Sequence, residues 1–214
     1  MGRTESRMIQ SEPQIYIVQN DPSIRNALRN LLKSVDLHAQ FFTSALEFKT
    51  AERPDILSCL ILDVRLPGMS GLDLQLELNR ANIPIPIIFV TAHGDIPMAV
   101  RAMKAGAVEF LTKPFRDQDL LDAVHVALDR DRLRRSREHQ TATLNGRLKL
   151  LTARERELLP WVVSGRPNKE IAAELGMSEI TVKVHRGKLM RKMQAPSFAD
   201  LVRMASDLKI PTRK

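Results

Sequence analysis

A single carboxylate stands where an apolar run meets a turn rich in proline and glycine. Residues 58–62 (Ser-Cys-Leu-Ile-Leu) show no alternation of polar and apolar side chains, which is typical of a parallel strand covered on both faces. Asp63 follows this run, and Pro67 and Gly68 lie in the turn behind it. Functional groups in open parallel sheets collect at the carboxyl ends of the strands. The sequence therefore predicts that Asp63 lies at a functional site.

Three more apolar runs end in polar groups that could share a crevice with Asp63. They end at Gln19-Asn20-Asp21, at Thr91 and at Lys113. Aspartate is a covalent phosphoryl acceptor in some enzymes, and lysine with hydroxyl donors can hold the added phosphate oxygens. The set therefore indicates an aspartyl-phosphate pocket. On spacing alone, an ordinary ion pair between Asp63 and Lys113 at the sheet edge is an equal alternative.

The elements that must position these groups alternate regularly along the front of the chain. Strands are expected at 15–18, 37–42, 58–62, 85–90 and 108–111. Helices are expected at 22–35, 44–50, 72–78, 96–105 and from 117 onward, with Asp21 as the first N-cap. Strands that alternate with helices predict an α/β fold, a doubly wound five-stranded parallel sheet.

The net charge of +8 is placed unevenly. Residues 1–125 carry −2, residues 126–148 carry +3, and residues 149–214 carry +7. A small basic unit behind a near-neutral one favours an acidic polymer as partner, nucleic acid first. The alternative is a surface that is charged for solubility.

Composition excludes several classes of protein. The single Cys59 rules out an internal disulfide framework and cysteine-based zinc sites, and it fits a reducing cytoplasm. No apolar run reaches the roughly 18 residues of a membrane span, so no membrane partner is expected. We expect a disordered N-terminus over 1–13, one domain over 14–128, a helical linker over 129–147 and a second domain over 148–214. The linker helix should fade between Thr141 and Gly146.

The rear domain is predicted to be a small all-α unit with a helix-turn-helix at about 168–192. Thr152 and Glu155 form a capping box, and Pro160 should kink or shorten the helix behind it. Asn168 and Ser178 are expected to cap the next two helices, 169–175 and 179–193. Packing is expected from Ile171, Ala172, Leu175, Ile180, Val182 and Leu189, and surface cations from Lys183, Arg186, Lys188, Arg191 and Lys192.

The front motifs resemble a response-regulator receiver domain. The resemblance rests on residues 62–72 (LDVRLPGMSGL), 90–92 (VTA) and 110–115 (FLTKPF). It implies that Asp63 is the phospho-acceptor, Thr91 the switch hydroxyl, Phe110 the switch aromatic and Lys113 the phosphate-contacting cation. It also implies a cis Lys113-Pro114 peptide and a sensor histidine kinase as partner.

The receiver pattern is broken at the end of the first strand. Receivers usually carry two acidic residues there, which hold Mg²⁺ together with the acceptor aspartate, whereas this chain has Gln19 and Asn20. Mg²⁺ prefers charged oxygen ligands. Binding through Asp63 and the Arg65 backbone carbonyl should therefore be weak. The hypothesis is that phosphorylation is weak, partner-dependent or absent.

The rear motifs resemble a LuxR-type DNA-binding domain, so the whole chain resembles the NarL/FixJ family of response regulators. The resemblance rests on 151–157 (LTARERE), 167–172 (PNKEIA) and 178–186 (SEITVKVHR). It implies double-stranded promoter DNA as partner, with Lys183 and Val184 facing bases. The expected DNA-binding set is Asn168, Lys169, Ser178, Thr181, Lys183, Val184, Arg186, Lys188 and Arg191.

The resemblance also implies a homodimer on DNA, with RNA polymerase as a further possible partner. The stripe Leu201, Val202, Ala205 and Leu208 is the expected dimer face, although it could equally be core of its own domain. Gly187 stands where some members carry a base-reading lysine, so the recognised DNA sequence does not transfer. A remote alternative is a phosphatase-like enzyme with an Asp63 nucleophile, but that leaves the rear domain unexplained.

Overall fold

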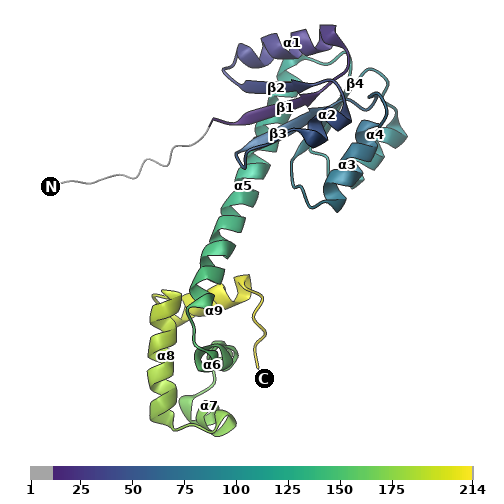
Figure 1. The fold of residues 1–214 in the computed structure, drawn as a ribbon. Helices are drawn as coiled ribbons and strands as arrows, with labels where there is room; N and C mark the ends of the chain where they lie inside the picture. The colour runs from purple at the N-terminus through teal and green to yellow at the C-terminus, as the bar shows by residue number, and fades with distance from the viewer. Residues whose placement is uncertain (1–11, 214) are drawn as a thin grey trace, which may run out of the picture. The chain divides into compact units, whose positions relative to one another are not determined.

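The computed structural model describes residues 12–213, and the chain divides into two compact units after Arg134 (Figure 1). The expected disorder of residues 1–13 falls almost wholly outside the described residues. We refer below to the α/β unit, which ends at Arg134, and to the helical unit, which begins at Arg135.

The α/β unit is built on one parallel sheet with the strand order β2-β1-β3-β4-β5. All pairings are parallel. The strand order reverses between β1 and β3, and binding sites in doubly wound sheets lie at this switch point. The predicted fold is therefore confirmed. The strands are β1 Gln14–Val18, β2 His38–Phe42, β3 Ser58–Leu62, β4 Ile87–Thr91 and β5 Glu109–Thr112.

Helices connect the strands, and local sequence signals set their ends. Asp21 caps the first helix as predicted, because its carboxylate accepts the N–H groups of Ser23 and Ile24 at 2.8 and 3.4 Å. Gly106 follows the fourth helix with φ +93°, a conformation that favours glycine. The helices of this unit are α1 Pro22–Lys33, α2 Ala45–Thr50, α3 Gly71–Arg80, α4 Ile96–Lys104 and the start of α5 Asp117–Lys149.

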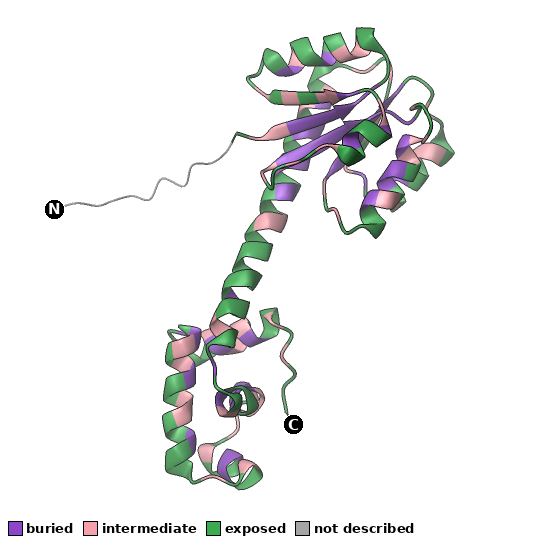
Figure 2. Cartoon of the chain, in the orientation of Figure 1, coloured by how far each residue is buried: buried purple, intermediate pink, exposed green. Residues whose placement is uncertain are grey.

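The sheet separates two hydrophobic cores, and β3 contributes to both. Leu60 and Leu62 pack in the core beneath α2, α3 and α4, whereas Cys59 and Ile61 pack in the core beneath α1 and α5. All five residues of β3 are buried, as the buried colour of the central strands shows in Figure 2. The run without alternation is thus explained by burial on both faces.

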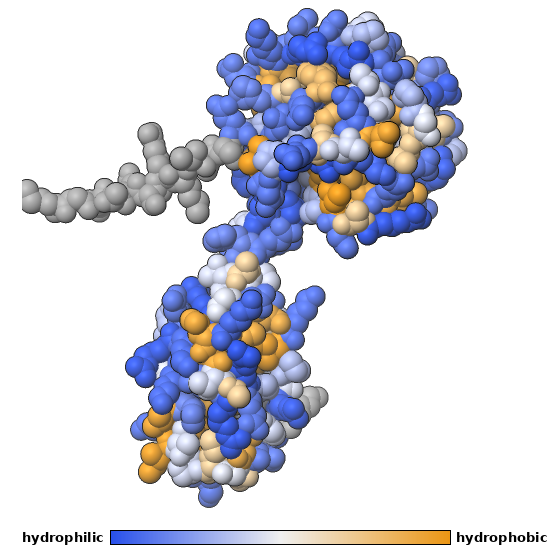
Figure 3. Space-filling view, viewed as in Figure 1, coloured by the Kyte–Doolittle hydropathy of each residue, from blue (hydrophilic) through white to orange (hydrophobic). Residues whose placement is uncertain are grey.

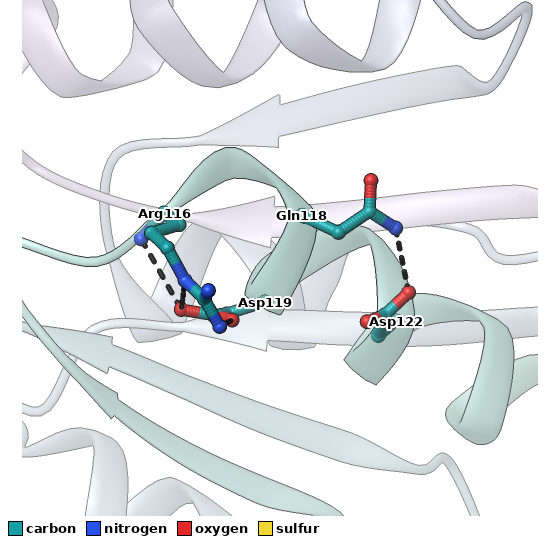
Figure 4. Close-up of polar contacts among 4 residues, drawn as sticks. All are labelled: Arg116, Gln118, Asp119 and Asp122. Carbon is teal, nitrogen blue, oxygen red and sulfur yellow. Dashed lines mark hydrogen bonds and ion pairs between the residues drawn. The ribbon is translucent and has the colours of Figure 1, made fainter.

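Helix α5 begins at a cluster of polar contacts (Figure 4). Asp119 accepts hydrogen bonds from the backbone N–H and the guanidinium of Arg116, and Gln118 donates to Asp122 at 2.7 Å. The helix then continues to Lys149, so the expected fading between Thr141 and Gly146 is wrong.

The helical unit contains the end of α5 and four further helices. Thr152 and Glu155 form the predicted capping box at the first of these helices. This helix runs through Pro160 to Val163, so it is not shortened as the sequence suggested. The four helices are α6 Ala153–Val163, α7 Asn168–Leu175, α8 Glu179–Met193 and α9 Phe198–Asp207.

The apolar stripe of α9 packs inside its own unit. Leu201 and Ala205 are 0% and 2% exposed, and Val202 and Leu208 pack against the same core. Leu201 and Ala205 are therefore intradomain core, whereas Val202 and Leu208 are only partly buried. The assignment of this stripe as a dimer face stays a prediction. Within residues 12–213, no helix combines the length and apolar character needed to cross a membrane.

Candidate functional sites

Asp63 lies directly beyond the end of β3, at the point where the strand order reverses. Its backbone N–H donates to the carbonyl of Val18 at 3.0 Å, and its carboxylate accepts the N–H of Arg65 at 3.1 Å. The loop that follows packs closely against the backbone of Asp63. A Cβ at Gly71 would lie 2.1 Å from the Asp63 carbonyl oxygen. Only glycine fits at that position. Asp63 is thus held at the carboxyl edge of the sheet, with 9% of the residue exposed.

Lys113 follows β5, which β4 separates from β3 in the sheet, and its ammonium is buried without a hydrogen-bond partner among the described residues. Its backbone N–H donates to the carbonyl of Thr91, which joins the ends of β4 and β5. Burial lowers the pKa of Lys113, although Asp63 and Asp21 both act in the opposite direction. The Lys113-Pro114 peptide is cis, as the resemblance implied. An unpaired buried cation near a carboxylate is suited to receiving an anion.

Thr91, the last residue of β4, and Phe110, within β5, complete the predicted set. Thr91 is fully buried, and its hydroxyl accepts the N–H of His93 at 3.3 Å. Phe110 is half-buried, with its ring centroid 5.8 Å from that of Phe89. Gly94 passes directly over this ring, because a Cβ there would lie 2.7 Å from Phe110. The loop after β4 therefore packs closely against the Phe110 ring.

The end of β1 carries a cation in addition to its two amides. The guanidinium of Arg25 donates to the backbone carbonyls of Gln19 and Asn20 at 2.8 and 2.5 Å. Gln19 is buried, and its side-chain oxygen accepts the N–H of Asp21 at 3.1 Å. Asp21 is itself engaged in capping α1, and the bonds from Ser23 lower its pKa. Arg25 was not among the predicted site residues, and its position six residues after Gln19 was the only signal in the sequence.

This donor set does not fit a magnesium site well. Receiver domains generally use Mg²⁺ for phosphorylation. Here Asp63 supplies one carboxylate, the β1 end supplies neutral amides, and Arg25 covers the carbonyls of that loop. No cluster of three or more His, Cys, Asp or Glu side chains suited to a metal occurs among residues 12–213. The role of the Arg65 carbonyl stays a prediction.

The helical unit presents a basic face along α8. Lys183, Val184, Lys188 and Arg191 are exposed on this helix, and Lys169 is exposed on α7. Ser178 caps α8 as predicted, because its hydroxyl accepts the N–H of Thr181 at 3.1 Å. Lys192 differs from the other cations, since it pairs at 2.7 Å with the buried carboxylate of Glu155.

Two predictions for this unit are corrected by the structure. Asn168 does not cap α7; Pro167 is the N-cap residue, and the Asn168 side chain instead accepts a hydrogen bond from Arg186 at 2.9 Å. Ile180 was expected to pack between helices but is 76% exposed.

The fold and the two sites define a class: a receiver-type α/β domain joined to a helix-turn-helix DNA-binding domain. Residues 15–125 match the family model of the response regulator receiver domain. Residues 149–205 match the model of bacterial regulatory proteins of the luxR family. The chain therefore belongs to the NarL/FixJ family of two-component response regulators, which are DNA-binding transcriptional regulators.

Several known proteins resemble the chain over most of its length. Nodulation protein W of Bradyrhizobium diazoefficiens is 55% identical over 196 residues, covering 92% of this chain and 86% of that protein. Response regulator protein TodT of Pseudomonas putida is 47% identical over 195 residues, covering 91% and 86%. A low-resolution structure of the response regulator StyR superimposes with a TM-score of 0.81 at 46% identity, covering 92% and 99%. Full-length FixJ from B. japonicum gives 0.56 at 36% identity, covering 92% and 97%.

Proposed function

We propose that phosphorylation of Asp63 controls how the helical unit binds promoter DNA. The observation that carries this proposal is the buried ammonium of Lys113, which lacks a hydrogen-bond partner within residues 12–213 and lies near Asp63. A phosphohistidine of the partner sensor kinase would be the donor. Its P–N bond breaks as a P–O bond to the Asp63 carboxylate forms, and the added dianion gains Lys113 and the Thr91 hydroxyl as partners.

The test is phosphoryl transfer to wild type and to Asp63→Asn. Intact-mass measurement after incubation with acetyl phosphate, or with a phosphorylated kinase, should show one added phosphoryl group on wild type only. The aspartyl phosphate should be lost on mild alkaline treatment. Equal modification of Asp63→Asn would overturn the assignment of the acceptor.

A second candidate is a receiver that works with little Mg²⁺-dependent phosphorylation. The contacts of Arg25 with the carbonyls of Gln19 and Asn20 favour it, because a cation there opposes the binding of a second cation. The double substitution Gln19→Asp with Asn20→Asp should then raise modification by acetyl phosphate and Mg²⁺ several-fold. Rapid, stoichiometric modification of wild type would exclude this candidate.

We further infer that α8 enters the major groove and that the chain binds as a homodimer. A two-fold protein would recognise half-sites about 10 base pairs apart, or multiples of that spacing. Lys183→Ala should weaken specific binding by about 1–3 kcal/mol if Lys183 contacts a base, whereas Lys188→Ala should weaken binding to all sequences alike. Unchanged affinity in both variants would count against this placement of α8.

RNA polymerase is the expected further partner. The protein is expected to act in the cytoplasm and to have no enzymatic activity.

A further inference from the structure

Helix α8 carries an apolar strip on its exposed face. Ile180 and Val184 are 76% and 49% exposed, and Gly187 lies one turn further along. The opposite face is the packed one, where Val182, Leu189 and Met193 are 0% exposed. Figure 3 shows hydrophobic surface over the start of α8 among hydrophilic atoms. We call Ile180, Val184 and Gly187 the apolar strip.

Cations lie on both sides of the apolar strip. At about 100° per residue, the three residues of the strip fall within about 60° of one another around the helix. Lys183 then lies on one side of the strip and Lys188 on the other, and both are exposed. Arg191 continues the same face one turn beyond Gly187. An apolar centre with a cation on each side is complementary to a ligand whose apolar groups are flanked by negatively charged or hydrogen-bond-accepting groups.

Folding does not explain why these residue types occur on this face. An isoleucine that is three-quarters exposed contributes little to the core. Glycine is among the least favourable residues inside a helix, and a Cβ at Gly187 would meet no atom within 4 Å. A close approach by a partner would account for both, because a bare Cα leaves room for the partner beside two apolar side chains.

We propose that the apolar strip reads thymine bases through their C5-methyl groups, with Ile180 as a specificity-determining residue. This proposal rests on the proposed DNA-binding function. In the major groove, Lys188 contacts the bordering phosphates and Lys183 contacts acceptors on the base edges, while the thymine methyl is the apolar group on those base edges. A second copy of the same face is disfavoured as occupant, since the flanking lysines would repel one another.

The experiment compares thymine with deoxyuridine, which lacks only the methyl group. Duplexes are first selected from a random library with the full-length protein, and each thymine of the selected site is then replaced singly by deoxyuridine. For wild type, at least one replacement per half-site should lower affinity about fourfold, the loss expected for one buried methyl group. Ile180→Ala should bind the selected duplex more weakly and should no longer distinguish thymine from deoxyuridine at that position.

Leu46→Ala is the matched control, since Leu46 is an exposed aliphatic residue of α2 in the α/β unit, with 69% of its surface accessible. It should keep the full sensitivity to deoxyuridine. Unfolding followed through Trp161, the single tryptophan, checks that Ile180→Ala is folded, and far-UV circular dichroism checks Leu46→Ala. If wild type binds its selected duplex but no deoxyuridine replacement changes its affinity, the proposal is overturned while DNA binding stands. If no sequence is enriched at all, the proposed function fails and the reading of thymine with it.

Discussion

The carboxylate of Asp131, on α5, accepts a hydrogen bond from the backbone N–H of Ser58, the first residue of β3, at 3.1 Å. Asp131 is 1% exposed, and its other oxygen accepts two bonds from the guanidinium of Arg134 at 2.9 and 2.7 Å. Strand β3 is therefore held by α5 at one end and carries Asp63 beyond the other. The helix that leads into the helical unit is thus bonded directly to the central strand of the receiver sheet.

Replacement of Asp131 should destabilise the α/β unit. Asp131→Ala leaves a buried N–H at Ser58 without this acceptor, so the free energy of unfolding should fall by about 1–3 kcal/mol. Urea denaturation followed by far-UV circular dichroism measures the change. Asp131→Asn keeps an oxygen for Ser58 and should cost less. Asp129→Ala, at an exposed pair with Arg132, is the control and should change the stability by less than about 0.5 kcal/mol.

Lys113 should make stability rise with pH in the alkaline range. Its pKa is lowered in the folded protein, so the unfolded chain binds more protons in the window between the folded value and about 10.4. The free energy of unfolding of wild type should therefore increase, relative to Lys113→Met, as pH rises through that window. The measurement is urea denaturation of both proteins at several pH values.

Lys104→Met, at an exposed lysine of α4, is the control and should show no such pH-dependent difference from wild type. At neutral pH, Lys113→Met should be at least as stable as wild type, because an unpaired buried charge is removed. The same variant should lose the response of DNA binding to phosphorylation. A Lys113→Met variant that is less stable at neutral pH, with a difference independent of pH, would contradict this account.

Glu155 should give the helical unit an acid-sensitive stability. Burial would raise its pKa, but the bonds from Lys192 and Thr152 outweigh burial and the pKa lies below its usual value of 4.5. This contribution is present above pH 4.5 and is lost as pH falls through the folded value. Glu155→Gln should therefore lose about 1–2 kcal/mol near neutral pH and approach wild type in acid.

Trp161 lies in the helical unit and reports its unfolding separately in the full chain. Glu157→Gln is the matched control, since Glu157 forms an exposed pair with Arg154. It should leave both the stability and its pH dependence close to wild type. A loss in Glu155→Gln that persists unchanged at pH 3 would show that packing, and not the charge, is responsible.

Local patterns predicted most of the fold because the signals lie within a few residues of the structure they determine. Asp21 and Ser178 cap their helices through bonds to residues two or three positions away. The apolar run 58–62 also predicted β3 correctly, because burial on both faces leaves no place for a polar residue. The position of Asp63 at the end of β3 followed from the same run.

Two of the failures share a different cause, namely contacts between distant parts of the chain. Asn168 accepts from Arg186, eighteen positions away, and therefore does not cap α7. Helix α5 persists to Lys149 because its last turns pack on the helical unit, where Arg147 donates to the carbonyl of Met193 at 3.2 Å. Ile180 was misplaced for another reason, since hydrophobic patterning assumes that apolar residues face the core of their own chain.

Gly187→Ala should stabilise the helical unit while weakening its binding to DNA. The added methyl group meets no atom within 4 Å, and alanine is the better helix former, so the free energy of unfolding should rise by about 0.4–1 kcal/mol. If bases approach the bare Cα, the methyl group occupies their space and the affinity for a selected duplex should fall several-fold. Trp161 fluorescence in urea gives the stability, and fluorescence anisotropy of a labelled duplex gives the affinity.

Ala173→Gly, on the exposed side of α7, is the control with the opposite change of residue. It should lower the stability of the helical unit without changing its discrimination between DNA sequences. A stabilised Gly187→Ala that binds as tightly as wild type would mean that DNA does not approach this part of α8.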